Sequence, residues 1–145
     1  MKRISIPFIA MIATAALAVT AQAAGTPTVK LASTGIGKIL VTGKGFTVYV
    51  FSADRRNHDV CVTKSGCATT WPPVTTKAQL VAGPGLNARL LGTVKLPSGA
   101  RQVTYSGHPL YRYSFDSSRA ATDYVGANEF GGHWDALNAA GRLVK

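Results

Sequence analysis

Two copies of one motif combine carboxylates with tyrosine hydroxyls. Each copy has a tyrosine, a second aromatic residue two positions later and an aspartate three positions after that: Tyr49, Phe51 and Asp54, and Tyr111, Tyr113 and Asp116. If the fold brings the two aspartates together, their carboxylates could transfer protons or hold a cation. The alternative is an aromatic core in which each aspartate caps a turn. These six residues are candidate binding residues, and no catalytic residue is assigned.

A tryptophan follows each motif, at Trp71 and at Trp134. Trp71 precedes Pro72 and Pro73, and such an aromatic residue could form a platform for a sugar or a peptide. The alternative is that it packs in the core beside a disulfide. Both tryptophans join the candidate binding residues.

The chain has two cysteines, Cys61 and Cys67. In an oxidising compartment they should form a disulfide, and closing this short loop should stabilise the fold by about 2 kcal/mol. A redox-active pair usually has two residues between its cysteines and lies at the start of a helix, which this segment does not indicate. We therefore predict a structural disulfide.

His58, His108 and His133 are the three histidines, and they are too far apart in sequence for a local metal motif. We expect surface turn positions for them and keep them only as weak metal candidates. The haem motif Cys-x-x-Cys-His and the nucleophile motif Gly-x-Ser-x-Gly are both absent from the sequence. No cofactor is predicted, and the sequence favours a non-catalytic protein over an enzyme.

The N-terminus has the three parts of a secretory signal peptide. A basic start at Lys2 and Arg3 precedes an apolar stretch over residues 4–19, and residues 21–23 read Ala-Gln-Ala. We predict a signal peptide over residues 1–23 and a mature chain from Ala24, with an uncleaved anchor as the alternative. No cysteine for lipid attachment lies near the cleavage site, and no later stretch has the roughly 18 apolar residues of a spanning helix. A periplasmic or secreted location follows.

The chain is basic, with 16 Lys and Arg against six Asp and Glu, a net charge of +10. Loss of Lys2 and Arg3 leaves 14 basic and six acidic side chains, so the mature chain carries +8. Outside the cytoplasm the abundant anions belong to lipid, lipopolysaccharide and cell-wall polymers, which makes nucleic acid an unsuitable partner. The alternative is a charged surface that only keeps an exported protein soluble.

The mature sequence contains an internal repeat. A shift of 62 residues superimposes the two motifs, and one further insertion superimposes the two tryptophans. This predicts one domain over residues 24–145, with repeat one at about 36–74, a connector at 75–97 and repeat two at about 98–137. Two copies are too few for a solenoid, so we expect them to pack about a pseudo-twofold axis.

Each repeat has the pattern of a β-hairpin. In repeat one, strands over residues 39–41 and 46–51 flank a turn at 43–45; in repeat two, strands over 102–105 and 110–113 flank a turn at 106–107. Residues 84–92 suggest a short helix, residues 93–96 a strand and residues 75–83 an exposed loop. The predicted fold is mainly β, with at most a short helix.

The sequence resembles a family of secreted proteins and lipoproteins with a YxFxxD repeat. The residues that carry the resemblance are Tyr49 to Asp54, Cys61, Gly66 to Ala68, Trp71 to Pro73, Gln102 to Asp116 and Gly131 to Trp134. The family implies an envelope location and no known chemistry. This chain departs from it by lacking a lipid-attachment cysteine near the cleavage site. It also has Ser117 to Ala120 and Asn128 to Phe130 where the family tends to have a Pro-Gly-Asp turn and a glycine-rich approach to the tryptophan.

These observations favour an exported, non-catalytic protein with a binding or structural role in the envelope or periplasm, in contact with anionic envelope components. One alternative is a periplasmic redox- or metal-linked protein that uses its histidines and the Tyr/Asp motifs. Another is a hydrolase or transferase that acts on cell-wall material through Asp54 and Asp116.

Overall fold

The computed structural model describes residues 25–145. The predicted signal peptide, residues 1–23, lies outside the described residues. Within residues 25–145, no helix has the length and apolar character needed to cross a membrane.

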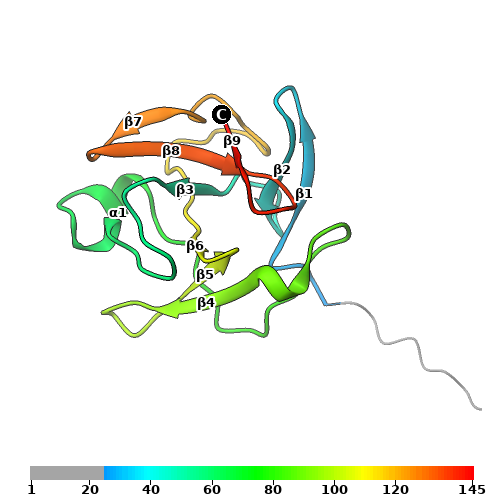
Figure 1. Cartoon of the computed structure of the whole chain (residues 1–145), viewed down its shortest axis with the longest axis horizontal. Coiled ribbons are helices and arrows are strands. Elements are labelled where there is room, and N and C mark those ends of the chain that lie inside the picture. The colour runs from blue at the N-terminus through cyan, green and yellow to red at the C-terminus, as the bar shows by residue number, and fades with distance from the viewer. Residues whose placement is uncertain (1–24) are drawn as a thin grey trace, which may run out of the picture.

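In residues 25–145, nine short strands form three antiparallel sheets (Figure 1). The first sheet pairs β1 (Val29–Thr34) with β2 (Gly37–Thr42). The second has the order β3 (Tyr49–Phe51), β8 (Gly132–Leu137) and β7 (Ala127–Glu129), and β9 (Leu143–Val144) also pairs with β8. The third has the order β4 (Leu91–Lys95), β5 (Arg101–Tyr105) and β6 (His108–Pro109). The mainly β prediction is confirmed.

The helical content is one turn of α-helix, α1 (Cys67–Thr70), and two 3₁₀ turns, η1 (Cys61–Thr63) and η2 (Ala88–Leu90). The helix expected over residues 84–92 is reduced to η2, where the Asn87 side chain accepts a hydrogen bond from the Arg89 amide. The expectation that no helix starts at the cysteines was wrong, because α1 begins at Cys67. Gly66 precedes it with a φ of 75°, a conformation that glycine adopts at no steric cost.

The hairpin predicted for repeat one forms only in part. Residues 46–48 do pair with β2, through a bridge between Val41 and Thr47. The chain then leaves β2, and β3 pairs instead with β8, where Phe51 lies opposite Trp134. The long partner of β2 is β1, which the sequence analysis did not predict. In repeat two, the predicted turn at Ser106 and Gly107 joins β5 to β6, and both residues have positive φ, as a type I′ turn requires. The second strand is shorter than the predicted 110–113, because the chain leaves β5 after Leu110 and Tyr111 pairs with repeat one.

The two repeats exchange strand partners about a pseudo-twofold axis. Tyr49 and Tyr111 face each other, and the amide of each donates to the carbonyl of the other, over 2.8 and 2.9 Å. On its other side Tyr49 pairs with Ala136 of repeat two, whereas Tyr111 pairs with Pro73 of repeat one. Each motif tyrosine therefore has two backbone partners, and both come from the opposite repeat. One is the tyrosine of the opposite motif, and the other is the segment that follows the opposite tryptophan.

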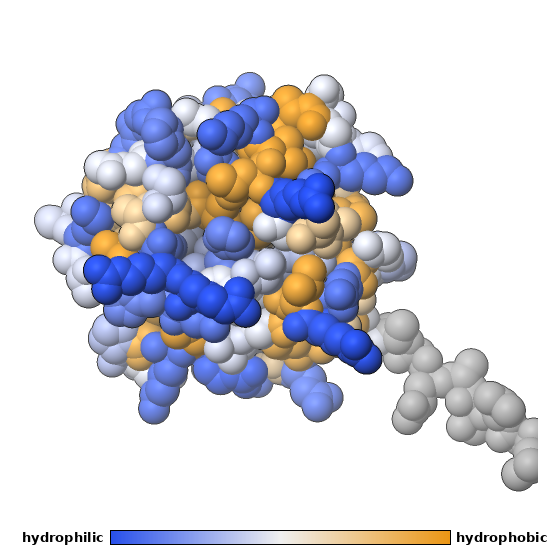
Figure 2. Space-filling view, in the orientation of Figure 1, coloured by the Kyte–Doolittle hydropathy of each residue, from blue (hydrophilic) through white to orange (hydrophobic). Residues whose placement is uncertain are grey.

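The core consists of three clusters of buried side chains. One holds the motif aromatics, both tryptophans and the disulfide; a second is aliphatic and lies between β1, β2, β5 and β8; a small third cluster contains Ile39, Val41 and Ala136. The first cluster combines side chains of both repeats, so the core forms at the junction of the repeats. On the outside, Figure 2 shows strongly hydrophilic side chains spread over the visible face, with apolar residues between them.

Candidate functional site

The motif tyrosines and aspartates bond crosswise between the repeats. The Tyr111 hydroxyl donates to Asp54 Oδ2 over 2.7 Å. The Tyr49 hydroxyl donates to both carboxylate oxygens of Asp116, at 3.1 Å each. Because Tyr49 and Tyr111 are paired through their backbones, each ring can reach the aspartate of the opposite motif. The two aspartates therefore belong to separate tyrosine–carboxylate pairs.

Burial determines the electrostatics of both pairs. Both tyrosines are fully buried and Asp116 is 9% exposed, whereas Asp54 is half-buried. Burial raises the pKa of Asp54 to about 6, although hydrogen bonds from the Val60 amide and the Tyr111 hydroxyl oppose the rise. Burial likewise raises the pKa of Asp116 to about 6, against the Tyr49 hydrogen bond and the charge of Arg112.

The two phenols remain protonated donors. Burial and the neighbouring carboxylate both raise the pKa of Tyr49, and the same two causes raise that of Tyr111. Asp54 also caps a turn, since its Oδ1 accepts the Val60 amide over 2.8 Å. The arrangement can hold two chain segments together through a protonated phenol and a carboxylate, as in the core-and-turn interpretation.

The tryptophans stack on each other across the same axis. Their ring centroids are 4.0 Å apart and their planes differ by 4°. Phe51 stacks on Trp134 at 4.3 Å, and Tyr113 packs on Trp71 at 4.5 Å, so these contacts also join opposite repeats. Both indoles are fully buried, and their N–H groups donate to Glu129, from Trp71 to the carboxylate and from Trp134 to the backbone carbonyl. Neither ring has an open face.

A buried carboxylate beside this cluster, that of Asp59, was not predicted from the sequence. Asp59 is 5% exposed, its Oδ1 accepts the Val62 amide over 2.7 Å, and its charge contributes to the raised pKa of Asp54. Its Oδ2 has no hydrogen-bond partner among the described residues. The spacing of an aspartate three residues before an amide that it caps is the signal that could have identified it.

The histidines do not converge. His58 and His133 are exposed and His108 is half-buried, but the turn positions expected for two of them were wrong, because His108 lies in β6 and His133 in β8. Burial and the charge of Arg56 lower the pKa of His108, which favours its neutral form. Among residues 25–145, no group of three or more histidine, cysteine or acidic side chains has the arrangement to hold a metal ion.

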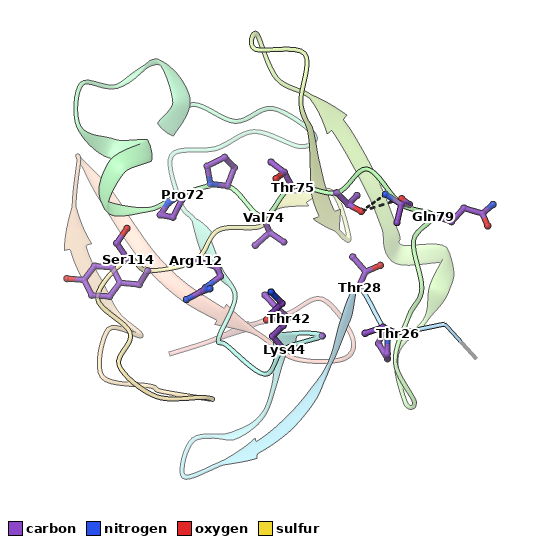
Figure 3. A pocket seen from close by; sticks show the side chains of 16 residues that line it. Thr26, Thr28, Thr42, Lys44, Pro72, Val74, Thr75, Gln79, Arg112 and Ser114 are labelled. Atoms are coloured by element: carbon purple, nitrogen blue, oxygen red, sulfur yellow. Dashed lines mark hydrogen bonds between the residues drawn. The ribbon is translucent and has the colours of Figure 1, made fainter. Parts of the chain in front are cut away.

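A groove of about 600 Å³ lies on the repeat-one side of the molecule (Figure 3). Its walls are the segment before β1, the turn after β2, residues 72–79 and residues 112–114. Lys44 and Arg112 contribute two positive charges, and none of the described residues that line the groove is acidic. The Arg112 guanidinium lies 4.0 Å over the ring of Phe46. This groove could not be predicted from the sequence, because its walls come from four separate segments.

The exposed side chains carry a larger net charge than the +8 of the predicted mature chain. All six acidic residues lie in the described chain, yet Asp123 alone among them is exposed; Asp59, Asp116 and Asp135 are buried, and Asp54 and Glu129 are half-buried. Eleven of the 14 basic side chains in residues 25–145 are exposed: Lys38, Lys44, Arg55, Arg56, Lys77, Arg89, Lys95, Arg101, Arg119, Arg142 and Lys145. Counting exposed side chains alone, eleven positive charges less one negative charge gives +10.

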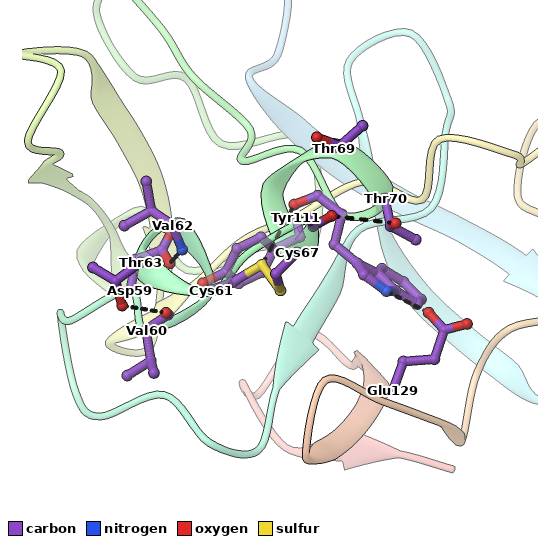
Figure 4. The surroundings of a disulfide bond; sticks show 12 residues. Asp59, Val60, Cys61, Val62, Thr63, Cys67, Thr69, Thr70, Tyr111 and Glu129 are labelled. Atoms are coloured by element: carbon purple, nitrogen blue, oxygen red, sulfur yellow. Dashed lines mark hydrogen bonds between the residues drawn. A yellow bond between two sulfur atoms is a disulfide. The ribbon is translucent and has the colours of Figure 1, made fainter.

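The disulfide between Cys61 and Cys67 is present, as predicted (Figure 4). It joins η1 to α1, and both cysteines are fully buried. The Trp71 amide donates to the Cys67 carbonyl over 2.7 Å at the end of α1, so the closed loop leads directly into the tryptophan stack. The disulfide therefore positions Trp71.

Residues 30–75 and 92–138 each match a protein family described as a secreted repeat of unknown function. The two matches cover more than half of the chain, so the protein belongs to this family, as the resemblance indicated, and is an exported protein. The matched segments begin within β1 and β4, whereas the sequence analysis placed the repeats from about 36 and about 98. Searches of curated proteins and of solved structures found no match.

Proposed function

We propose that the protein is a non-catalytic binding protein of the cell envelope or periplasm, and that it binds anionic envelope components. The observation that carries this proposal is the distribution of charge. Five of the six acidic side chains are wholly or partly buried, whereas eleven basic side chains are exposed. A surface with almost one sign of charge attracts polyanions over distances of about a Debye length.

The burial of the motif supports the non-catalytic part of the proposal. A catalytic acid or base must come within hydrogen-bond reach of a substrate. Tyr49, Tyr111 and Asp116 are 0 to 9% exposed, and Tyr49 bonds to Asp116 of the other repeat. Asp54 is half-buried, and its two carboxylate oxygens accept hydrogen bonds from Tyr111 and from the Val60 amide. Their chemistry is used to join the repeats, which leaves the basic surface to interact with partners.

The test measures binding to defined anionic surfaces. The mature protein is sedimented with phosphatidylglycerol-containing vesicles, with pure phosphatidylcholine vesicles and with insoluble acidic polysaccharide. Each assay is run at about 0.01 M and at about 0.15 M salt, between which the Debye length falls from about 30 Å to about 8 Å. We expect binding to at least one anionic partner that weakens as salt rises, and none to phosphatidylcholine. Absence of binding to every anionic partner at the lower salt would refute the proposal.

A further inference from the structure

We propose that the groove on the repeat-one side is a binding site for a segment of acidic glycan, held by Lys44 and Arg112. This inference rests on the proposed function and assigns it a place and a ligand. Its starting point is the internal symmetry of the fold. A surface feature that arises merely from the shape of a repeat should occur twice, once in each repeat.

The counterpart of the groove in repeat two is filled by a side chain. The match between the motifs, a shift of 62 residues, sets Gly43 of the groove against Tyr105. Tyr105 is fully buried; its hydroxyl donates to the Ala139 carbonyl over 2.7 Å and accepts the Asn87 amide over 3.2 Å. With the additional inserted residue, Ala139 corresponds to Thr76, which lines the groove. The tyrosine therefore occupies in repeat two the space that is open in repeat one.

Two further positions show the same difference. Arg112 of the groove corresponds to Val50, which is 3% exposed, and Val74 corresponds to Leu137, which is fully buried. Val50 and Leu137 pack with Tyr105 in the aliphatic core cluster. The counterpart of the groove thus has three apolar or aromatic side chains, Tyr105 and Leu137 from repeat two and Val50 from repeat one. The groove itself has the smaller Gly43 and Val74 from repeat one and the charged Arg112 from repeat two. The groove therefore arises from a difference between the two repeats and not from the repeat shape.

Gly43 also fixes the groove wall. A Cβ atom at this position would overlap the carbonyl oxygen of Pro27, whereas the Gly43 amide donates to the Thr28 carbonyl over 3.0 Å. A side chain like that of Tyr105 could not be placed here with the segment before β1 in its present position. The open groove and the path of that segment therefore depend on the same glycine.

The groove has the chemistry of an acidic, hydroxyl-rich ligand. Arg112 is fixed from one face by Phe46, and its Nε is buried without a hydrogen-bond partner among the described residues. A ligand in the groove would meet the terminal nitrogens of the guanidinium rather than this buried Nε, and carboxylate and phosphate are the groups that arginine binds best. Lys44 is exposed in the turn after β2, which forms another wall of the groove, and supplies a second charge.

The remaining walls suit a carbohydrate. Hydroxyl and amide side chains can bond to sugar hydroxyls, and the groove lining includes five threonines, a serine and Gln79. Pro72, Pro73 and Val74 provide an apolar strip for the C–H face of a sugar ring (Figure 3). Small-ligand sites commonly occupy about 300 to 1,000 Å³, so the groove can hold a short glycan segment.

The experiment uses tetragalacturonate as an acidic probe and its methyl ester as a neutral one, with affinity measured by calorimetry. The groove variant is K44Q/R112Q. The control variant K38Q/R142Q removes the same two charges from exposed positions that do not line the groove. We expect the groove variant to bind the acid at least about tenfold more weakly than the wild type, the control to change it by about twofold or less, and the ester not to bind.

Folding is checked separately. Because Arg112 packs on Phe46, K44Q alone is tested as well; Lys44 is exposed, so this change should leave the melting temperature unaltered and still weaken binding. R112K keeps the charge but loses the planar fork and should also bind more weakly. Equal loss in the groove and control variants would overturn the groove assignment while leaving charge-driven binding intact. Vesicle binding without glycan binding would overturn the glycan assignment. Failure of the wild type to bind any anionic partner would refute the proposed function itself.

Discussion

At the scale of single residues, the repeated motif acts across the molecule and not within its own repeat. Each tyrosine donates to the other repeat's aspartate, and each second aromatic residue packs on the other repeat's tryptophan. This crosswise arrangement explains why the two motifs have the same spacing. Two pairs related by a twofold axis need the tyrosine and the aspartate to be the same number of residues apart in both copies. The motif is therefore an interlock between repeats.

A double-mutant cycle measures this crosswise arrangement. Tyr49→Phe leaves the buried Asp116 carboxylate without its hydroxyl donor and should lower the free energy of unfolding by about 1 to 3 kcal/mol. The cycle of Tyr49→Phe with Asp116→Asn should give a coupling energy of about 1 kcal/mol, whereas Tyr49→Phe with Asp54→Asn should be nearly additive. Denaturant unfolding provides the values. Stronger coupling within the same motif than between motifs would contradict the arrangement.

The raised pKa values predict how stability depends on pH. Asp54 and Asp116 titrate near 6 in the fold and near 3.8 when unperturbed, so the folded state binds their protons more tightly than the unfolded state. This contribution to stability is complete below about pH 4 and is lost as pH rises through about 6, on the order of 1 to 2 kcal/mol per carboxyl. Asp116→Asn should reduce the loss seen between these pH values in urea titrations. An identical pH profile for wild type and variant would show that this carboxyl does not carry the effect.

At the scale of elements, the sequence predicted those structural features that are determined by residues close together in the chain. The β5–β6 hairpin follows from the Ser106-Gly107 turn, and the disulfide follows from two cysteines in an exported chain. The pattern over residues 46–51 correctly indicated extended structure, but not that its second half would leave β2 for β8, more than 80 residues away. Local patterns show that a buried segment needs partners without showing which partner packs best.

The exchanged strands predict that neither repeat is stable alone. Fragments 25–83 and 84–145, separated at the exposed Pro84, each lack the strand that pairs with their motif. Each fragment alone should lack the near-ultraviolet circular dichroism of a packed aromatic core, and an equimolar mixture should recover it. Full-length protein cut at the same loop serves as the reference for the mixture. A fragment that shows the native signal by itself would contradict the interlocked arrangement.

At the scale of the whole molecule, duplication and divergence have separate consequences. The symmetric features, the crosswise tyrosine–aspartate pairs and the tryptophan stack, are buried in the junction. The asymmetric feature, Gly43 and Arg112 against Tyr105 and Val50, opens a basic groove at the surface. The sequence repeat directed attention to the symmetric residues, and the candidate site predicted from it consists of core residues. The groove was missed because its signal is a difference between the repeats.

The central claim is that the buried motif joins the repeats while the groove binds the ligand. The most direct test compares a core variant with a groove variant in one binding assay. Asp54→Asn and K44Q/R112Q are titrated with tetragalacturonate at a temperature where both are folded, and their melting temperatures are recorded. The account predicts that Asp54→Asn, which loses a carboxylate bonded to Tyr111 and Val60, changes the melting temperature and retains wild-type affinity, whereas K44Q/R112Q loses at least about tenfold in affinity. Loss of affinity in folded Asp54→Asn, with unchanged affinity in K44Q/R112Q, would contradict it and place binding at the motif.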